Sequence, residues 1–304
     1  MNLKRYIIVL ACAAMPMVAS AQALPFTAVN HNPVSLGMAG ASSADLSSSV
    51  SSAFADPASA GFYTGKAELQ IADVIWQPST VKVNVAYLSG VYKVGKNVAV
   101  SAGFSYGIHQ EYEVVNQSGV STGTFKPSDM HVSAGFAWRF LPFLSLGANV
   151  GYASSKLAAG SSYGTVVMDA ALMARLGGFR VSLGLSDLGG KVASASGKKF
   201  SLPTSVALGV GYDLSFAEKH CLNFNVDADY YLDGAFAAGV GMTYSYGDMA
   251  FVRAGYHYGA DSVIPSFASV GVGVKVVGIT VDLSYLIGNS PMANTIGVSL
   301  GYAF

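Results

Sequence analysis

Charged residues are scarce in this chain. They make up 11% of its 304 residues, while 52% are hydrophobic, and a soluble domain typically carries about 25% charged residues. A surface that mostly faces water is therefore not indicated, and a soluble β-sandwich or lipocalin-like barrel remains as the alternative architecture. The 17 basic and 17 acidic residues lack the basic excess of a nucleic-acid-binding protein, so we expect no nucleic acid among its partners.

Long hydrophobic runs are missing as well. Beyond the amino terminus, no stretch of about 18 apolar residues occurs, so a transmembrane helix is not indicated. Glycine is abundant, with 35 residues, and there are 17 tyrosines and 16 phenylalanines. High apolar content without long apolar runs is the result of alternation. A glycine-rich, aromatic-rich and charge-poor composition is typical of membrane β-barrels.

Patterns that mark chemistry are weak. The two cysteines are Cys12 and Cys221, and removal of an amino-terminal signal would leave only one, so no internal disulfide can form. The five histidines lack zinc-ligand spacing, and no glycine-rich phosphate loop follows a strand. Asp227 and Asp229 share one strand face, but the sequence marks no cleft beside them. We therefore predict no cofactor, no metal site, no catalytic residue and no enzyme activity.

The first 21 residues have the pattern of a secretory signal peptide. Two basic residues, Lys4 and Arg5, precede an apolar stretch at 6–15, and a small-x-small site ends at Ala21. We expect cleavage after about Ala21 and a location in the bacterial outer membrane. A lipoprotein-like signal ending at Cys12 is the alternative, and it would leave a very short apolar stretch.

From Lys66 onward the hydrophobic pattern has a period of two residues, which indicates strands. About a dozen residues is enough for a tilted strand to cross a bilayer, and bacterial barrels have an even number of strands. We predict an all-β fold, a 14-stranded antiparallel transmembrane β-barrel over 66–304, with strands near 66–76, 80–93, 97–110, 129–140, 143–156, 164–176, 179–187, 204–215, 220–231, 235–246, 249–258, 266–277, 278–287 and 293–304.

The connections between these segments alternate in length. Every second connection is short, at 94–96, 141–142, 177–178, 216–219, 247–248 and 277–278. The others are mostly longer, at 111–128, 157–163, 188–203, 259–265 and 288–292. Short periplasmic turns and longer outer loops are typical of outer-membrane barrels, so we place the amino terminus in the periplasm.

Alternation also predicts which side chains face lipid. In the segment 80–93 we expect Val83, Val85 and Tyr87 outside and Asn84 inside. A Lys or Arg on the lipid face near mid-membrane costs roughly 2–4 kcal/mol, so barrel charges are expected in the lumen. We interpret them as structural salt bridges rather than a substrate path; they are Arg139, Asp169, Arg175, Asp227, Asp229, Arg253, Lys275 and Asp282.

The last twelve residues, 293–304, alternate most strictly. Large apolar residues occupy one face and small or polar residues the other, and the segment ends on Phe304. We expect this strand to pair with the first strand and close the barrel. It resembles the terminal signal of outer-membrane barrels, so Tyr302 and Phe304 are expected to be recognised by the barrel-assembly machinery.

Residues 22–65 are rich in Ser, Ala and Gly and show no period of two. We predict a short helix at 44–54 that ends at Asp56-Pro57, because proline restricts the residue before it. The segment is too apolar for a tail, so we divide the chain into a signal peptide (1–21), an amino-terminal hatch in the lumen (22–65) and a barrel (66–304). The alternative for 22–65 is a disordered periplasmic linker.

The motif of the predicted hatch consists of a glycine turn, a serine-rich stretch and an Asp-Pro pair. The runs LGMAGA at 36–41, SSS at 47–49 and ADPA at 55–58 resemble the hatch of the FadL-like outer-membrane superfamily, and within it the PorV/PorQ branch. Ala39 stands where that family usually has glycine, and Asp56 where it usually has asparagine. The residues that carry the resemblance are Gly37, Met38, Gly40, Asp56 and Pro57.

The resemblance implies three alternative functions. A PorV/PorQ-type protein would be associated with type IX secretion, as a shuttle or anchor for secreted cargo, with the loops 111–128 and 188–203 as partner surfaces. A FadL-like channel would take up small hydrophobic molecules passively, with a ligand pocket formed by Leu36, Met38 and Phe54. The third alternative is a structural membrane protein with a plugged lumen. In each case the barrel would contact outer-membrane lipid.

Overall fold

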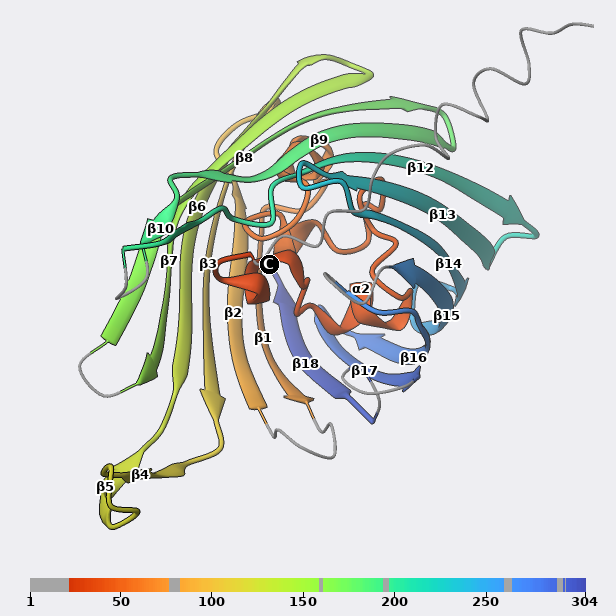
Figure 1. Cartoon of the computed structure of the whole chain (residues 1–304). Coiled ribbons are helices and arrows are strands. Elements are labelled where there is room, and N and C mark those ends of the chain that lie inside the picture. Colours follow the sequence, from red (N-terminus) through yellow and green to blue (C-terminus); the bar gives the residue numbers. More distant parts are fainter. Residues whose placement is uncertain are drawn as a thin grey trace, which may run out of the picture.

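The protein is a closed barrel of antiparallel strands (Figure 1). The computed structural model describes residues 22–76, 83–158, 161–193, 197–259, 264–288, 292 and 294–304; the predicted signal peptide lies outside this range. The barrel contains fourteen strands, as predicted. They are β1 (Ala67–Trp76), β2 (Val83–Lys93), β3 (Val98–His109), β6 (Ser128–Leu141), β7 (Leu144–Ala158), β8 (Ser161–Leu176), β9 (Phe179–Gly189), β12 (Ser205–Phe216), β13 (His220–Tyr231), β14 (Phe236–Tyr246), β15 (Ala250–Gly259), β16 (Phe267–Val276), β17 (Ile279–Gly288) and β18 (Ile296–Ala303).

Closure of the barrel depends on the pairing of β1 with β18. Leu69 lies opposite Tyr302 and Ile71 opposite Leu300, and the backbone N–H of Phe304 donates to the carbonyl of Ala67 at 2.9 Å. This pairing leaves no free sheet edge, so the backbone groups of the edge strands are satisfied without water.

The outer surface of the barrel is apolar. In β16, for example, Val270, Val272, Val274 and Val276 are each about half exposed, while the residues between them point inward. Similar rows of exposed aliphatic and aromatic side chains occur on the other barrel strands. Such a band on a closed barrel suits contact with lipid rather than water. Among the described residues, no helix is long and apolar enough to cross a membrane.

Two details of the barrel differ from the prediction. The predicted outer loop at 157–163 is largely strand, because β7 runs to Ala158 and β8 begins at Ser161. The faces of β2 are also inverted: Val85 and Tyr87 are buried in the lumen, whereas Asn84 is exposed outside. Both faces of β2 carry apolar side chains, so alternation alone could not choose between them.

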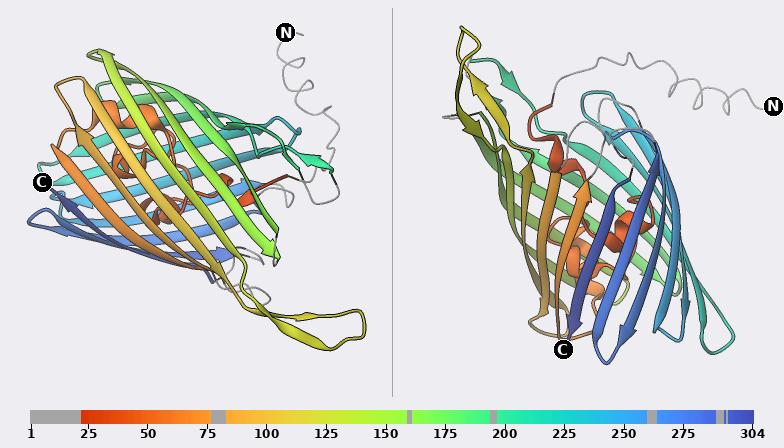
Figure 2. Two further views of the ribbon diagram at one scale, coloured as in Figure 1. Left: turned by 90° about the vertical axis from the view of Figure 1, so that its left-hand side faces the viewer. Right: turned by 90° about the horizontal axis from the view of Figure 1, so that it is seen from below.

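Residues 22–65, here called the luminal segment, lie inside the barrel (Figures 1 and 2). The segment contains one short α-helix, α2 (Pro33–Gly37), and three 3-10 helices, η1 (Pro25–Ala28), η2 (Ser49–Ser51) and η3 (Pro57–Phe62). Helix α2 packs against β15 to β18, η2 against β1 to β3, and η3 mainly against β6, β7 and β8.

Side-chain caps rather than long helical runs order the luminal segment. Asn32 accepts a hydrogen bond from the N–H of Val34 at 2.8 Å at the start of α2, and Asp56 accepts one from the N–H of Ala58 at 2.7 Å at the start of η3. Asp56-Pro57 therefore begins a helix rather than ending one, as expected for a capping residue followed by proline at the first helical position. The helix predicted over 44–54 was wrong, since only η2 forms there.

Glycines on the inner barrel wall make room for the luminal segment. A Cβ at Gly255 would overlap the backbone of Met38, and one at Gly103 would overlap the ring of Phe54. Met38 is completely buried. The close approach of backbone to wall explains why inward positions are so often glycine in this chain.

Two small hairpins in the described structure form sheets separate from the barrel. The strands β4 (Tyr112–Val115) and β5 (Ser121–Phe125) pair with each other, as do β10 (Val192–Ala193) and β11 (Lys199–Phe200). The β4–β5 hairpin projects well beyond the end of the barrel opposite the carboxy terminus (Figure 2).

Candidate functional site

The first cavity lies at the end of the barrel that is opposite the carboxy terminus. It is bordered by the last residue of β1, the first of β2 and the last of β3, and it measures about 280 Å³. We call it the outer cavity. Its lining is mostly apolar and consists of Pro25, Phe26, Val29, His31, Trp76, Val83, Val85, Ser105, Gly107, His109, Asp129, Ile264, Pro265 and Met292. The apolar inner face of β2 thus forms part of a cavity.

The polar groups of the outer cavity are paired or neutral. The Nε2 atom of His109 lies 2.6 Å from Oδ2 of Asp129. Burial lowers the pKa of His31 to about 4, so this imidazole, which belongs to the luminal segment, is uncharged at neutral pH. An uncharged apolar molecule would therefore meet no unpaired cation among the residues that line this cavity.

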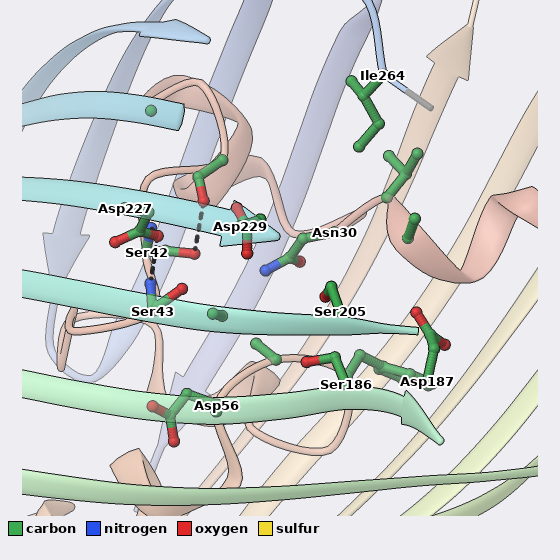
Figure 3. Close-up of a pocket in the computed structure, with 18 of the residues that line it drawn as sticks. Asn30, Ser42, Ser43, Asp56, Ser186, Asp187, Ser205, Asp227, Asp229 and Ile264 are labelled. Atoms are coloured by element: carbon green, nitrogen blue, oxygen red, sulfur yellow. Dashed lines mark hydrogen bonds between the residues drawn. The ribbon is translucent and has the colours of Figure 1, made fainter. Parts of the chain in front are cut away.

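A second cavity lies in the lumen beside the first (Figure 3). It measures about 150 Å³, and we call it the inner cavity. Four carboxylates line it, and none of the described lining residues is Lys or Arg. The acidic residues are Asp56, Asp187, Asp227 and Asp229, and the serines are Ser42, Ser43, Ser182, Ser186 and Ser205. The sequence marked no cleft beside Asp227 and Asp229, but both residues line this cavity.

Two of these carboxylates hold the luminal segment in place. Oδ2 of Asp227 accepts hydrogen bonds from the N–H groups of Ser42 and Ser43, both at 2.8 Å. Asp56 caps η3 with one oxygen, and its other oxygen accepts a hydrogen bond from the hydroxyl of Ser182 in β9. Burial raises the pKa of Asp56 to about 7, because a buried carboxylate loses its hydration.

Asp187 reaches the inner cavity from an irregular stretch of barrel wall. The β8–β9 register shifts between Met168 and Ala170, and Asp187 has a left-handed backbone with φ of 55°. The N–H of Asp187 donates to Oδ1 of Asp169 at 2.9 Å. The other oxygen of Asp169, Oδ2, accepts a hydrogen bond from the side-chain amide of Asn149 at 3.3 Å. Asp169 thus supports the bulge, and the bulge carries Ser186 and Asp187 to the cavity (Figure 3).

The two cavities adjoin. Val29, Ile264 and Met292 line both of them. Val29 belongs to the luminal segment, while Ile264 and Met292 come from connections at the outer end of the barrel. These three side chains form the wall between an apolar space and an acidic one.

The predicted luminal charges serve several purposes. Arg253 and Asp282 form a buried ion pair at 2.8 Å. Lys275 instead pairs with the exposed Asp248 at 3.6 Å, and Arg139 donates to the carbonyl of Lys96 at 3.1 Å. Arg175 lies two residues before the Gly177–Gly178 turn. Among the eight predicted charges, Arg253 and Asp282 are the only two that pair with each other in the described structure.

Sequence reasoning missed Arg180, which is 1% exposed. Its Nε donates to the carbonyl of Ala44 at 2.7 Å, and its guanidinium pairs with Asp213. Its position between Phe179 and Val181 in an alternating segment was the available signal. Arg180 therefore joins the barrel wall to the luminal segment.

The predicted ligand pocket is only partly assembled. Leu36 and Phe54 line the inner cavity, whose lining combines apolar side chains with four carboxyl groups. Met38 lines neither cavity; its sulfur accepts a hydrogen bond from the hydroxyl of Thr243 at 3.1 Å. Met38 was therefore wrongly placed, because it packs against barrel glycines instead of facing space. Of the remaining motif residues, Gly37 lies close to the barrel wall, where a Cβ would meet Cα of Gly271 at 3.3 Å, and Gly40 has a positive φ of 82°.

Metal chemistry has no support in the described part of the chain. No group of three or more His, Cys, Asp or Glu side chains in it is arranged to hold a metal ion. The four carboxylates of the inner cavity are spread along its lining (Figure 3) rather than gathered about one point.

No protein-family sequence model matches the chain, and no curated protein sequence matches it significantly. Solved structures do match. The toluene transporter TbuX of Ralstonia pickettii has a TM-score of 0.62 at 12% identity, over 90% of this chain and 97% of that one. The P. putida toluene transporter TodX has a TM-score of 0.61 at 15% identity, over 89% and 97%. A Pseudomonas aeruginosa FadL homologue has a TM-score of 0.56 at 12% identity, over 90% and 98%.

This chain has the fold of the FadL-type channels. This is the architecture that the FadL-like part of the resemblance implied, and no match concerns the PorV/PorQ branch. At such low identity the matches concern architecture alone; TbuX and TodX are themselves toluene transporters.

Proposed function

We propose that the protein is an outer-membrane channel for the passive uptake of small hydrophobic molecules. The observation that carries this proposal is the outer cavity, which is apolar and lies at the loop end of a barrel with a lipid-type exterior. An apolar cavity of about 150 Å³ accommodates benzene, so a cavity of about 280 Å³ admits a molecule with one aromatic ring. Two of the structural neighbours are toluene transporters.

In this proposal the luminal segment acts as the hatch. It fills the lumen beyond the outer cavity and contributes Val29 to the wall between the two cavities. A molecule bound in the outer cavity would have to displace this wall to move farther. The predicted signal peptide, with cleavage after about Ala21, and the predicted assembly residues Tyr302 and Phe304 supply export and insertion.

Tryptophan fluorescence tests the proposal. The chain has two tryptophans: Trp76 lines the outer cavity, and Trp138 is exposed on the outer face of β6. A Trp138→Phe protein in phosphatidylcholine nanodiscs therefore reports on the cavity alone. We expect toluene to change its fluorescence saturably. A change no larger than that of tryptophan in empty nanodiscs would contradict the proposal and favour a structural protein with a plugged lumen.

A cavity-filling variant sharpens this test. Gly107→Leu should weaken toluene binding about tenfold or more. The leucine side chain would occupy space in the outer cavity, so the ligand would bury less apolar surface there. A Cβ at Gly107 meets only ordinary contacts, the nearest being Cβ of Asp129 at 3.5 Å. Gly95→Leu is the matched control, since a Cβ there has nothing within 4 Å. Equal affinity in the two variants would place the binding site elsewhere.

The PorV/PorQ resemblance supplies a second candidate function, a shuttle or anchor for secreted proteins. The observation that favours it is the β4–β5 hairpin, which projects beyond the barrel (Figure 2) and exposes Tyr112, Val115 and Val120. Replacing residues 112–125 by a short Gly-Ser linker should then release cargo from the cell surface. Unchanged surface cargo, or a host genome without the rest of a type IX apparatus, would remove this candidate.

A further inference from the structure

The inner cavity has a chemistry that uptake of plain hydrocarbons does not use. Its lining carries four carboxylates and five serines, and His257 is the only titratable base among the described lining residues. It nevertheless adjoins the apolar outer cavity through the shared residues Val29, Ile264 and Met292. A ligand that extends past this wall would place its two ends in opposite environments.

We propose that the channel selects amphipathic amines, whose apolar body occupies the outer cavity and whose ammonium head is bound by the carboxylates of the inner cavity. This inference rests on the proposed uptake function and names the substrate class of the same site. The positive head follows from a lining with four acidic side chains and, among its described residues, no Lys or Arg, and the apolar body follows from the cavity next to it.

An unsatisfied carboxylate oxygen points to a missing donor. Asp227 is 4% exposed, and its Oδ1 accepts no hydrogen bond within the described structure, although Oδ2 accepts two. Asp229 is only half-buried; it lines the same cavity (Figure 3). A buried carboxylate without a partner is costly. An ammonium group supplies three N–H donors and a compensating charge.

The same lining disfavours the other head groups. A carboxylate head would meet four acidic side chains and no Lys or Arg among the described lining residues, so fatty acids are repelled. An inorganic cation is disfavoured because the described carboxylates do not converge into a metal-ligand group. Hydroxyls such as Ser186 and Ser205 can accept the remaining N–H groups of an ammonium head.

A set of matched ligands separates these possibilities. Butylbenzene, 4-phenylbutan-1-ol, 4-phenylbutylamine and 4-phenylbutanoate share a ring and a four-carbon chain and differ in the head group. Each is titrated into the Trp138→Phe protein in phosphatidylcholine nanodiscs at pH 7.5, with Trp76 as reporter and empty nanodiscs as the partitioning blank. We expect the amine to bind about tenfold tighter than butylbenzene, as a charge-assisted hydrogen bond implies, and the carboxylate to bind weakest.

An isosteric variant assigns the preference to the inner cavity. Asp229→Asn should lower the affinity for 4-phenylbutylamine about tenfold and leave that for butylbenzene unchanged. Asp73→Asn is the matched control, because Asp73 is exposed on the outer face of β1 and lines neither cavity. Unaltered heat-modifiable gel migration shows that both variants remain folded.

The outcomes separate the inference from the proposed function. If butylbenzene binds and the amine binds no tighter, or if Asp229→Asn leaves the amine preference intact, the inference is overturned while the uptake function stands. If none of the four ligands changes the signal saturably, both fail. Tightest binding of the carboxylate would also overturn the inference, because it requires a positive group in the inner cavity.

Discussion

At the scale of single residues, three aspartate side chains in one lumen serve different purposes. Asp227 accepts two backbone N–H groups of the luminal segment and so acts as a fixed attachment point. Asp56 belongs to that segment, caps η3 and bonds to Ser182 of the wall. Asp229 has neither task among the described residues and faces the cavity. What separates the three is the set of donors that the fold brings to each of them.

The environment of Asp56 predicts a pH dependence. Burial raises the pKa of Asp56 from 3.8 to about 7, so the folded state favours the protonated carboxyl. The stability that this group contributes is full below about pH 4 and is lost as the pH rises to about 7. Asp56→Asn stays neutral and can still accept from Ala58 N–H, so we expect it to stabilise the luminal segment at pH 7.5, by on the order of 1 kcal/mol per pKa unit.

Hydrogen exchange of the amides in residues 58–62 measures this effect. Protection in the parent protein should fall between pH 4 and pH 7 after correction for intrinsic exchange, and protection in Asp56→Asn should not. Asp73→Asn, which removes a carboxylate outside the lumen, should follow the parent. Parallel profiles for all three proteins would show that Asp56 does not control the segment.

At the scale of elements, β18 has the clearest role. Its outward side chains are apolar, and its inward residues are small or polar and pair with β1 and β17. The ring of Tyr302 packs edge-on against that of Phe304, with centroids 4.6 Å apart, and both side chains are exposed at the barrel end. These exposed aromatic side chains at the carboxy terminus are accessible to the barrel-assembly machinery, which we predict to recognise them before the barrel is inserted into the membrane.

Deletion of Phe304 should impair insertion before it impairs any transport. It removes the terminal ring and the hydrogen bond from Phe304 N–H to Ala67 at 2.9 Å, so most of the chain should fail to reach the outer membrane. Phe143→Ala is the control, because Phe143 is an exposed aromatic residue in the turn between β6 and β7 at the same end. Quantification in outer-membrane fractions tests this, and equal amounts of both variants would refute it.

At the scale of the whole molecule, the barrel separates three environments. The exterior is an apolar band, the lumen is largely filled by the luminal segment, and beside that segment lie an apolar cavity and a cavity with four carboxyl groups. The barrel wall is continuous and closed, so a molecule that enters through the outer cavity meets the luminal segment before it meets the periplasm.

Gel migration tests the architecture in cells. A closed transmembrane barrel resists detergent until it is heated, so the protein should fractionate with the outer membrane and change its migration on boiling. A periplasmic soluble form with the same migration before and after heating would contradict both the barrel in the membrane and the proposed function.

The strands, their number and their order were available from the sequence. Alternation in segments such as 266–277 and 293–304 is a local property, because successive side chains of a strand must point to opposite faces. The Asp-Pro pair at 56–57 was visible too, but its role as the start of η3 depends on the Ala58 N–H that it caps. The local sequence pattern therefore determined the strands of the barrel. For the luminal segment it indicated the capping residues but not the helices that they begin.

Tertiary structure alone decided the sites. Which face of β2 is inside depends on its register with β1 and β3, because Val85 and Leu88 are equally apolar. The inner cavity unites Asp56, Asp187 and Asp229 from a short helix cap, a bulge and a strand, and no spacing in the sequence brings these positions together. A cavity is the space left between elements, and its chemistry exists only once closure of the barrel and entry of the luminal segment have set those elements side by side.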